Sequence, residues 1–222
     1  MDAEVIVVGA GLAGLQCARQ LTRAGAEVRV LEAADDLGGR VRTDIIDGFR
    51  CDRGFQVLNP AYPAVQREVD VAALQLAHFG HGVAVRDSEG ITVVADPLRH
   101  PGAAPQALAG PYLRPDRLAA LARWASPALG NISRLLSPSD GTLAASLDDA
   151  GLTGELRAVL ERFFAGVLLE DEGATSANFA RLLARWFALG RPGLPAQGMS
   201  ALPHQLAAGL SRPVELGRRV SG

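Results

Sequence analysis

Residues 5–14 read VIVVGAGLAG, an apolar run that leads directly into a turn of closely spaced glycines. The apolar run over residues 4–8 predicts a fully buried strand, and the helical spacing of the residues after it predicts a helix over 11–24. Gly25 is a residue typical of helix ends. Residues 27–32 then return as a second strand, so the chain opens with a strand–helix–strand unit whose strands are parallel neighbours.

The glycines between the first strand and the helix have the spacing of a dinucleotide-binding loop. Gly9 allows the tight bend after the strand, Gly11 lets the backbone approach a pyrophosphate, and Gly14 lets the helix pack closely on the strand. The free N–H groups at the helix start, around Leu12 and Ala13, face the phosphate in such loops. An ordinary strand–helix turn is the structural alternative.

An acidic residue and a second glycine pair follow at informative positions. Glu32 ends the second strand, where its carboxylate accepts hydrogen bonds from ribose hydroxyls in dinucleotide-binding proteins. Gly38 and Gly39 let the backbone pass close to a ligand, and the guanidinium of Arg40 suits a pyrophosphate. Alone, this motif would be interpreted as a surface turn, but its place soon after Glu32 favours a cofactor site.

Residues 32–43, EAADDLGGRVRT, resemble the signature of FAD-dependent amine oxidases, a superfamily that includes protoporphyrinogen oxidases and phytoene desaturases. Within it, the chain is most similar to bacterial phytoene-dehydrogenase-like flavoproteins. The resemblance implies an α/β fold, in which a Rossmann-like FAD-binding domain with a parallel sheet of the glutathione-reductase type carries an inserted, mostly helical substrate domain. It also implies that Glu32 binds the adenosine ribose and that Arg40 lies near the pyrophosphate.

Three later segments extend the resemblance. Residues 52–56, DRGFQ, resemble the segment that passes beside the flavin ring, and residues 197–202, QGMSAL, resemble the segment that leads back into the FAD domain. Val220 falls where the family has a valine whose backbone meets the adenine. The expected cofactor-binding residues are Gly9, Gly11, Leu12, Ala13, Gly14, Glu32, Gly39, Arg40, Gly54, Phe55, Gln56 and Val220.

The resemblance also predicts the domain organisation. Residues 1–80 are expected to form the first part of the FAD-binding domain, residues 81–195 a hairpin and the helical substrate domain, and residues 196–222 an incomplete return to the FAD-binding domain. A third strand is expected over 214–220. Family members are longer, which implies that the C-terminal strands are missing from this sequence. Helices are expected near residues 118–125, 143–147, 156–164, 179–189 and 201–210.

Composition excludes several classes of function. The formal net charge of −2 does not favour binding to nucleic acid or to an anionic membrane, although a peripheral membrane contact stays open. The chain has no lysine to form a Schiff base. Cys17, expected to be a small buried residue, and Cys51 match no metal-ligand spacing, so neither a metal site nor a disulfide framework is expected. With no secretory signal and no apolar segment long enough to cross a bilayer, the expected location is the cytoplasm.

Four further groups of residues carry weaker signals. The histidines His78, His81, His100 and His204 lack metal-ligand spacing, and His204 is expected to be exposed or to cap a helix. Tyr62 is expected to pack in a turn, with a role at a substrate entrance as the alternative. The aromatic pairs at 163–164 and 186–187 are expected to be helix-packing core rather than a substrate wall. The acidic run 170–172 is expected to be a solvated loop.

These observations favour an FAD-dependent oxidoreductase. The flavin would accept a hydride equivalent from a C–N or C–C bond of a small amine or of an apolar, polyene-like substrate. Because the cofactor carries the difficult chemistry, no catalytic residue is assigned. A truncated, inactive FAD- or ADP-binding remnant is the first alternative, and an NAD-dependent dehydrogenase, with which Glu32 is compatible, is the second. The sequence fixes neither the substrate, the electron acceptor nor the oligomeric state.

Overall fold

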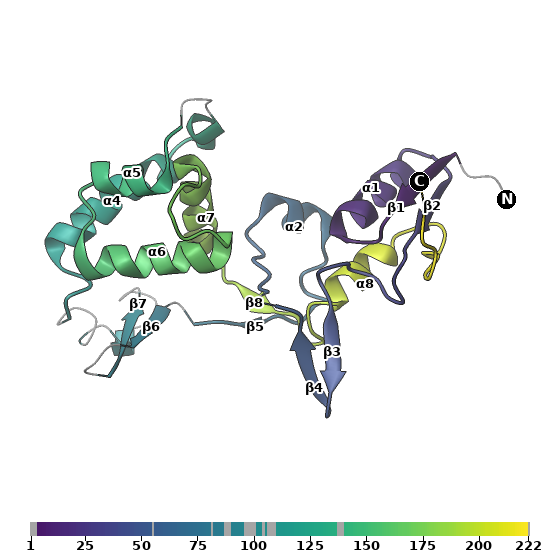
Figure 1. Cartoon of the computed structure of the whole chain (residues 1–222), viewed down its shortest axis with the longest axis horizontal. Coiled ribbons are helices and arrows are strands. Elements are labelled where there is room, and N and C mark those ends of the chain that lie inside the picture. Colours follow the sequence, from purple (N-terminus) through teal and green to yellow (C-terminus); the bar gives the residue numbers. More distant parts are fainter. Residues whose placement is uncertain are drawn as a thin grey trace. The chain divides into compact units, whose positions relative to one another are not determined.

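The protein is described by a computed structural model that covers residues 4–54, 56–80, 82–86, 90–95, 101–103, 105, 110–136 and 140–221. The chain divides into two compact units (Figure 1). The terminal unit combines residues 1–79 with 190–222, and the helical unit comprises residues 80–189. The helical unit therefore ends earlier than residue 195, where the sequence led us to expect its boundary. The reason is that β8 (Gly193–Leu194) pairs with β5 (Ala77–His78) of the terminal unit.

The terminal unit opens with the predicted strand–helix–strand order. Strand β1 (Val5–Val8) and strand β2 (Val28–Leu31) are parallel neighbours, and α1 (Leu12–Arg23) connects them. Gly25, with φ of +91°, turns the chain just after the helix. The core on the helix side of the sheet consists of Ala10, Leu15, Ala18, Val28, Val30, Leu37 and Leu206.

Two expectations about burial are wrong. Strand β1 is not fully buried, because Ile6 is 53% exposed and Val8 is 63% exposed. The alternation of its side chains places Val7 against the core, and in the described residues helix packing covers that face of the two-stranded sheet. Cys17 is exposed rather than buried, because it lies on the side of α1 away from Leu15.

The expected third strand over residues 214–220 is also wrong. Only Glu215 forms a bridge, parallel to Leu31 of β2. Its backbone N–H donates to Val30 O at 2.9 Å. Gly217 then takes a φ of +67°, a left-handed conformation that a continuing strand does not allow. The segment therefore leaves the sheet after one residue pair.

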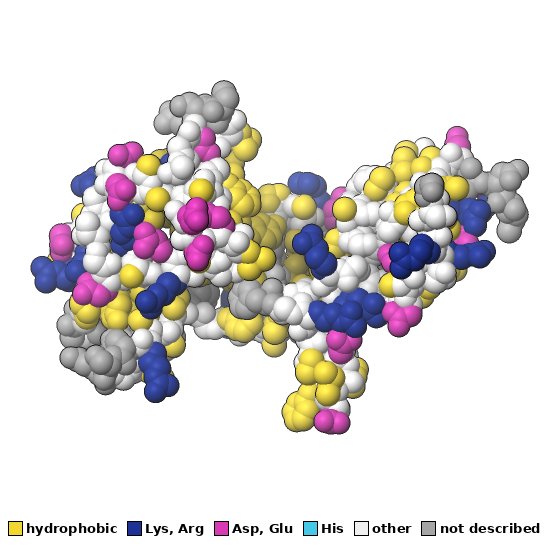
Figure 2. All heavy atoms as spheres, viewed as in Figure 1, with side chains coloured by type: hydrophobic (Ala, Val, Ile, Leu, Met, Phe, Trp, Pro, Cys, Tyr) yellow, Lys and Arg dark blue, Asp and Glu magenta, His cyan; other side chains and the backbone are white. Residues whose placement is uncertain are grey.

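A hairpin follows the second glycine pair. Strands β3 (Thr43–Ile46) and β4 (Phe49–Asp52) are antiparallel, and Asp47 and Gly48 between them both have positive φ. Asp-Gly is a sequence signal for such a two-residue turn, so this hairpin, which the sequence analysis did not name, was predictable. The hairpin leaves Ile45, Ile46 and Phe49 exposed, and apolar side chains gather on this part of the surface (Figure 2).

Two short helices complete the terminal unit. Helix α2 (Pro63–Glu68), which the sequence analysis missed, follows the hairpin, and α8 (Ala201–Ala207) forms within the predicted 201–210 segment. Helix α8 contacts α1, and its Leu206 belongs to the core beside β2. Residues near both ends of the chain thus build one unit.

The helical unit has the predicted hairpin and helices. Trp124 and Phe164 are each 1% exposed, and their rings meet edge to face with centroids 5.8 Å apart. The indole N–H of Trp124 donates to Ser146 Oγ at 2.9 Å, which satisfies the one polar atom of that side chain. No helix in the described ranges has the length and hydropathy that a bilayer span requires. The elements are β6 (Gly82–Arg86), β7 (Ile91–Ala95), η1 (Pro101–Ala103), α4 (Pro115–Leu129), η2 (Ile132–Leu136), α5 (Leu143–Asp149), α6 (Gly154–Leu168) and α7 (Ala177–Leu189).

Candidate cofactor-binding site

The first glycine turn is shaped by close approach of backbone to backbone. Gly9 has a φ of +95°, and a Cβ on Gly14 would lie 2.0 Å from the carbonyl oxygen of Gly9. Helix α1 can therefore start this close to β1 only with glycine at residue 14. A Cβ on Gly11, by contrast, would meet no heavy atom within 4 Å. The turn thus has open space at Gly11, the residue predicted to face a pyrophosphate.

The start of α1 offers backbone donors beside this space. Gly11 is the N-cap residue with extended backbone, and it supplies no side chain that could cap the helix. Leu12 and Ala13 lie in the first helical turn, where N–H groups have no acceptor within the helix. The positive end of the helix dipole adds to these donors, so the arrangement suits an anion.

Glu32 joins this turn through its side chain. Its carboxylate accepts hydrogen bonds from the backbone N–H of Ala10 at 2.7 Å and from that of Ala34 at 2.8 Å. These two backbone hydrogen bonds, the larger from Ala10, hold the pKa of the Glu32 carboxyl below its usual range. Glu32 is therefore ionised at neutral pH, and lone pairs remain on its oxygens to accept from hydroxyl groups.

The second glycine turn touches the first. Gly38 N–H donates to Ala10 O at 2.9 Å, so Ala10 is held at its N–H by Glu32 and at its carbonyl by Gly38. Gly38 has a φ of +100°, and a Cβ there would lie 2.2 Å from Val41 O. Gly39 has a φ of +60°, and its Cβ would lie 3.5 Å from the Cα atom of Gly11. The glycine turns at residues 9–14 and 38–39, which are separate in the sequence, therefore form one continuous backbone surface.

Arg40 leads from this surface to the segment expected at the flavin ring. The side-chain amide of Gln56 donates to Arg40 O at 3.0 Å and to Arg53 O at 2.8 Å, which brings residues 40 and 56 together. The Arg40 side chain is exposed. Gly54 has a φ of +78°, whereas Phe55 lies outside the described residues.

Val220 follows a C-terminal segment that is hydrogen-bonded to residues 32–34. Arg218 N–H donates to Glu32 O at 2.7 Å, and Gly217 N–H donates to Ala34 O at 2.9 Å. The C-terminal segment thus runs beside residues 32–34, and Val220, which is 50% exposed, follows two residues later. The structure therefore brings the segment that leads to Val220 beside Glu32.

Some residues of the site were not identified from the sequence. Ala10 and Ala34 act through backbone atoms, which carry no signal in the residue type. Thr43, Asp52 and Ser200 belong to the segments 32–43, 52–56 and 197–202 that carry the family resemblance. Their mutual contacts were not predicted, because a single sequence does not show hydrogen bonds between residues such as 43 and 200, which are 157 positions apart.

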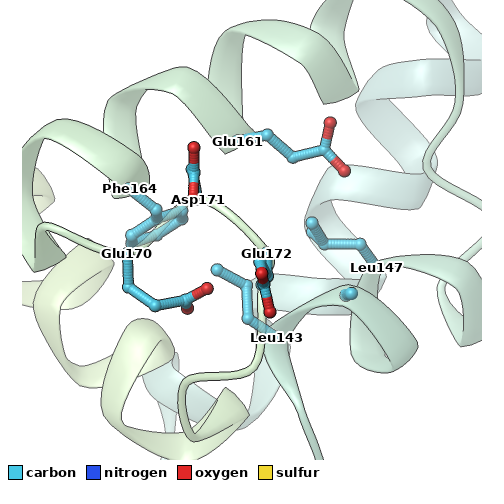
Figure 3. Close-up of a pocket in the computed structure, with 9 residues that line it drawn as sticks. Leu143, Leu147, Glu161, Phe164, Glu170, Asp171 and Glu172 are labelled. Atoms are coloured by element: carbon cyan, nitrogen blue, oxygen red, sulfur yellow. The ribbon is translucent and has the colours of Figure 1, made fainter.

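The helical unit contains a small acidic cavity (Figure 3). Glu161, Glu170, Asp171 and Glu172 surround a floor that includes Leu143, Leu147 and Phe164. Glu170 is not simply solvated as expected, because its carboxylate accepts from both the hydroxyl and the backbone N–H of Thr175. The hydroxyl hydrogen bond is the main cause that lowers the pKa of Glu170. The cavity volume of about 40 Å³ is far below that of a typical ligand pocket, about 300–1,000 Å³.

The remaining candidates have structural roles. His204 pairs with Asp36, with 3.2 Å between Nε2 and Oδ1, and His78 Nδ1 lies 2.8 Å from Arg191 O. Tyr62 begins α2, and burial raises the pKa of its phenol. His81 and His100 lie outside the described residues.

The aromatic pairs belong to helix packing, as predicted. Phe163 meets Phe187 edge to face with centroids 5.1 Å apart, and Arg185 lies over the Trp186 ring. In the described part of the chain, no three His, Cys, Asp or Glu side chains come together as a metal site would require.

The chain is similar to several known proteins. The family described as flavin containing amine oxidoreductase matches residues 12–222. Putrescine oxidase of Kocuria rosea is 36% identical over 100 residues, which make up 45% of this chain and 20% of that protein. Polyamine oxidase 2 of Arabidopsis thaliana is 44% identical over 69 residues, 28% of this chain and 14% of that protein.

Solved structures give the same result at the level of the fold. A putrescine oxidase bound to putrescine matches with a TM-score of 0.62 at 25% identity, over 98% of this chain and 51% of that one. Cyclohexylamine oxidase from Brevibacterium oxydans matches with a TM-score of 0.68 at 19% identity, over 97% of this chain and 51% of that one. The chain spans about half the length of these two solved structures and aligns with a smaller part of the two curated relatives.

The two joined glycine turns and the anchored glutamate define a protein of the dinucleotide-binding class. Within that class, the chain belongs to the flavin-containing amine oxidoreductase family. Membership confirms the amine oxidase resemblance and the flavin cofactor, FAD, that the sequence predicted. It favours these over an NAD-dependent dehydrogenase. The finer likeness to phytoene-dehydrogenase-like proteins stays a prediction.

Proposed function

We propose that this chain is the FAD-binding part of an oxidoreductase that acts on amines. The terminal unit is then the Rossmann-like FAD-binding domain, and the helical unit is the substrate domain. One observation carries the proposal: Ala10 is hydrogen-bonded to Glu32 on one side and to Gly38 on the other. This double contact makes a single anion-facing surface from the two motifs that the sequence assigns to FAD.

The proposal gives each residue a role in holding FAD. The N–H groups of Leu12 and Ala13 and the open space at Gly11 would receive the pyrophosphate, with Gly39 close by and Arg40 as counter-charge. The Glu32 carboxylate would accept from the adenosine ribose hydroxyls. At the two ends of the cofactor, the Val220 backbone would meet the adenine, and residues 54–56 would lie beside the flavin ring.

The reaction proposed is the oxidation of a C–N bond in a small amine. Bound flavin supplies the hydride-accepting chemistry, and the protein supplies orientation and exclusion of water. Putrescine and polyamine oxidases among the relatives support an amine over a polyene as the substrate class. An apolar substrate oxidised at a C–C bond is the less favoured form of the same proposal.

The compartment proposed is the cytoplasm. Cys17 and Cys51 are both free thiols and both exposed, which is compatible with a reducing environment. Small-molecule substrates reach such an enzyme by diffusion, so no macromolecular partner is part of the proposal.

Titration of the purified chain with FAD tests the proposal. We expect quenching of flavin fluorescence with saturable binding, and competition by ADP, because the ADP half carries most of the contacts assigned above. Circular dichroism of the same sample establishes that the chain is folded. A folded chain that binds neither FAD nor ADP overturns the proposal.

A cofactor-binding module without turnover is the second candidate function. It is favoured by the chemistry of the described site, since the residues assigned above bind the cofactor and none of them is given a catalytic role. A turnover assay with putrescine and cyclohexylamine, run on the FAD-loaded chain, separates the two. Amine-dependent reduction of the flavin supports the oxidoreductase, and binding of FAD without any reduction supports the module.

A further inference from the structure

Three segments that the sequence assigns to FAD are tied together by side-chain hydrogen bonds. They are the end of the second glycine motif at Thr43, the residue Asp52 at the end of β4, and the turn at Met199 and Ser200. Residues 43 and 200 are 157 positions apart in the chain. None of these side chains belongs to the cofactor contacts proposed above, and all are well placed to position them.

The hydrogen bonds form a closed set. Thr43 N–H donates to Ser200 Oγ at 2.6 Å, and Ser200 N–H donates back to Thr43 Oγ1 at 3.0 Å. The Thr43 hydroxyl donates in turn to Asp52 Oδ1, which also accepts from Met199 N–H at 2.9 Å. One carboxylate oxygen of Asp52 thus accepts from both Thr43 and Met199. The negative charge of the carboxylate strengthens these two hydrogen bonds.

The packing around the set leaves little freedom. Gly198 has a φ of +82°, and a Cβ there would lie 2.5 Å from both Cγ2 and Oγ1 of Thr43. Met199 is 4% exposed and packs with Leu58 and Leu202. Since the turn at Gly198 lies against the Thr43 side chain, a change in that side chain is transmitted directly to the turn.

The set also controls the segment expected at the flavin ring. Arg53 N–H donates to Arg42 O at 2.9 Å, and Gln56 donates to Arg40 O. Residues 40 and 42 are therefore bonded to residues 56 and 53. Thr43 fixes these segments to Ser200, and Asp52 fixes them to Met199. The flavin segment is thus anchored at Thr43 and Asp52, whereas the first glycine turn is held separately, through the hydrogen bonds of Ala10 with Glu32 and Gly38.

We propose that Thr43, Asp52 and Ser200 form a positioning latch that sets how tightly the flavin half of FAD is held. The latch acts through residues 53–56 and 197–200 and leaves the ADP half to the first glycine turn. This inference rests on the proposed function, because it assumes that residues 54–56 lie beside the flavin.

The ratio of FAD affinity to ADP affinity tests the latch. In the unchanged chain, we expect FAD to bind more tightly than ADP, because the latched segment would contribute contacts to the flavin. The double variant T43V/S200A removes both side-chain partners at nearly constant shape. We expect its FAD affinity to fall about tenfold, the size of one or two lost hydrogen bonds. Its ADP affinity is expected to change by less than about twofold, so the ratio of FAD affinity to ADP affinity falls about tenfold.

Three further variants keep the test decisive. Thr43→Ser retains the hydroxyl and restores the ratio. Thr142→Val in the helical unit removes a hydroxyl that caps α5, and it controls for general destabilisation without altering the ratio. Asp52→Asn, which weakens the acceptor of the latch, replaces the double variant if that protein does not fold, and it lowers the ratio in the same direction.

The outcomes separate this inference from the proposed function. Binding of neither FAD nor ADP by the folded unchanged chain overturns both. Binding of both ligands with a ratio that the double variant leaves unchanged overturns the latch alone. Loss of FAD and ADP affinity by the same factor also overturns it, because that result describes a general structural role.

Discussion

The candidate site of the terminal unit and the core of the helical unit are held together by different kinds of contact. In the terminal unit, the candidate site consists of backbone atoms and one carboxylate, with Ala10 held between Glu32 and Gly38. In the helical unit, the core consists of side chains, such as the rings of Trp124 and Phe164 at 5.8 Å. At several positions of the candidate site, only glycine allows the close backbone contacts. In the helical core, apolar residues of similar volume can replace one another.

This difference explains where the sequence is informative about function. Positions that require a positive φ or a close backbone approach accept one residue type, so their spacing identifies the ligand class. Packing positions accept many residue types, so the helical unit reveals helices but no chemistry. Variants of matched size, one in each kind of environment, test whether the two units differ in this way.

Gly14→Ala is expected to have the largest effect. Its Cβ would lie 2.0 Å from Gly9 O, a backbone atom that cannot move without displacing β1 or α1. Such overpacking costs about 2–3 kcal/mol of unfolding free energy, and we expect FAD affinity to fall by roughly 100-fold. Thermal melts and FAD titration measure the two effects.

Gly11→Ala is the matched control for this variant. Its Cβ meets no atom within 4 Å, so the melting temperature should stay unchanged while the methyl group enters the space proposed for the pyrophosphate. FAD affinity is therefore expected to fall about tenfold without loss of stability. Equal melting temperatures for Gly14→Ala and the unchanged chain would show that the close approach is not required.

The sequence predicts the terminal unit well where local rules apply. The strand–helix–strand order, the glycine roles at residues 9 and 14 and the acidic residue at the end of β2 all follow from spacing. The contact between the two glycine turns does not, because it joins backbone atoms of Ala10 and Gly38 that no residue type encodes.

The wrong predictions for residues 214–220 and for the burial of β1 also have identifiable physical causes. The segment at 214–220 was expected to be a strand, yet the positive φ of Gly217 limits its sheet pairing to the bridge at Glu215, and hydrogen bonds of Gly217 and Arg218 to residues 34 and 32 replace a continued strand. Strand β1 has the composition of a strand covered on both faces, but helix packing covers only the Val7 side in the described residues. Burial depends on which elements meet in space, and a single strand sequence does not contain that information.

Glu32→Gln is expected to have an intermediate effect. The amide oxygen can replace one acceptor of the carboxylate, but its NH₂ group then faces the N–H of Ala10 or Ala34, donor against donor. We expect FAD affinity to fall about tenfold. Part of the loss should persist for 2′,3′-dideoxy-ADP, which has no ribose hydroxyls, because the variant also releases the turn at Ala10. If Glu32→Gln and the unchanged chain bound 2′,3′-dideoxy-ADP equally, the contribution of Glu32 to binding would come from the ribose hydroxyls alone.

The same variant has a defined pH dependence. The pKa of Glu32 is lowered in the folded chain, so its contribution to stability is complete above the ordinary value of 4.5 and is lost as the pH falls through the lower, folded-state pKa. The difference in melting temperature between the unchanged chain and Glu32→Gln should therefore shrink in acid below pH 4.5. A difference that stays constant there would contradict the ionised, hydrogen-bonded carboxylate.

The smallest expected effect lies in the helical unit and compares two threonines at helix starts. Thr142 Oγ1 accepts from Ala145 N–H at 3.2 Å and caps α5, whereas Thr153 begins α6 without a side-chain capping hydrogen bond. Thr142→Ala should lower the unfolding free energy by about 1 kcal/mol, and Thr153→Ala by about half that or less. Neither should change FAD affinity, because both positions belong to the unit that the proposal assigns to substrate. A fall in FAD affinity with Thr142→Ala would show that the stability of the helical unit affects cofactor binding. That result would contradict the assignment of separate roles to the two units.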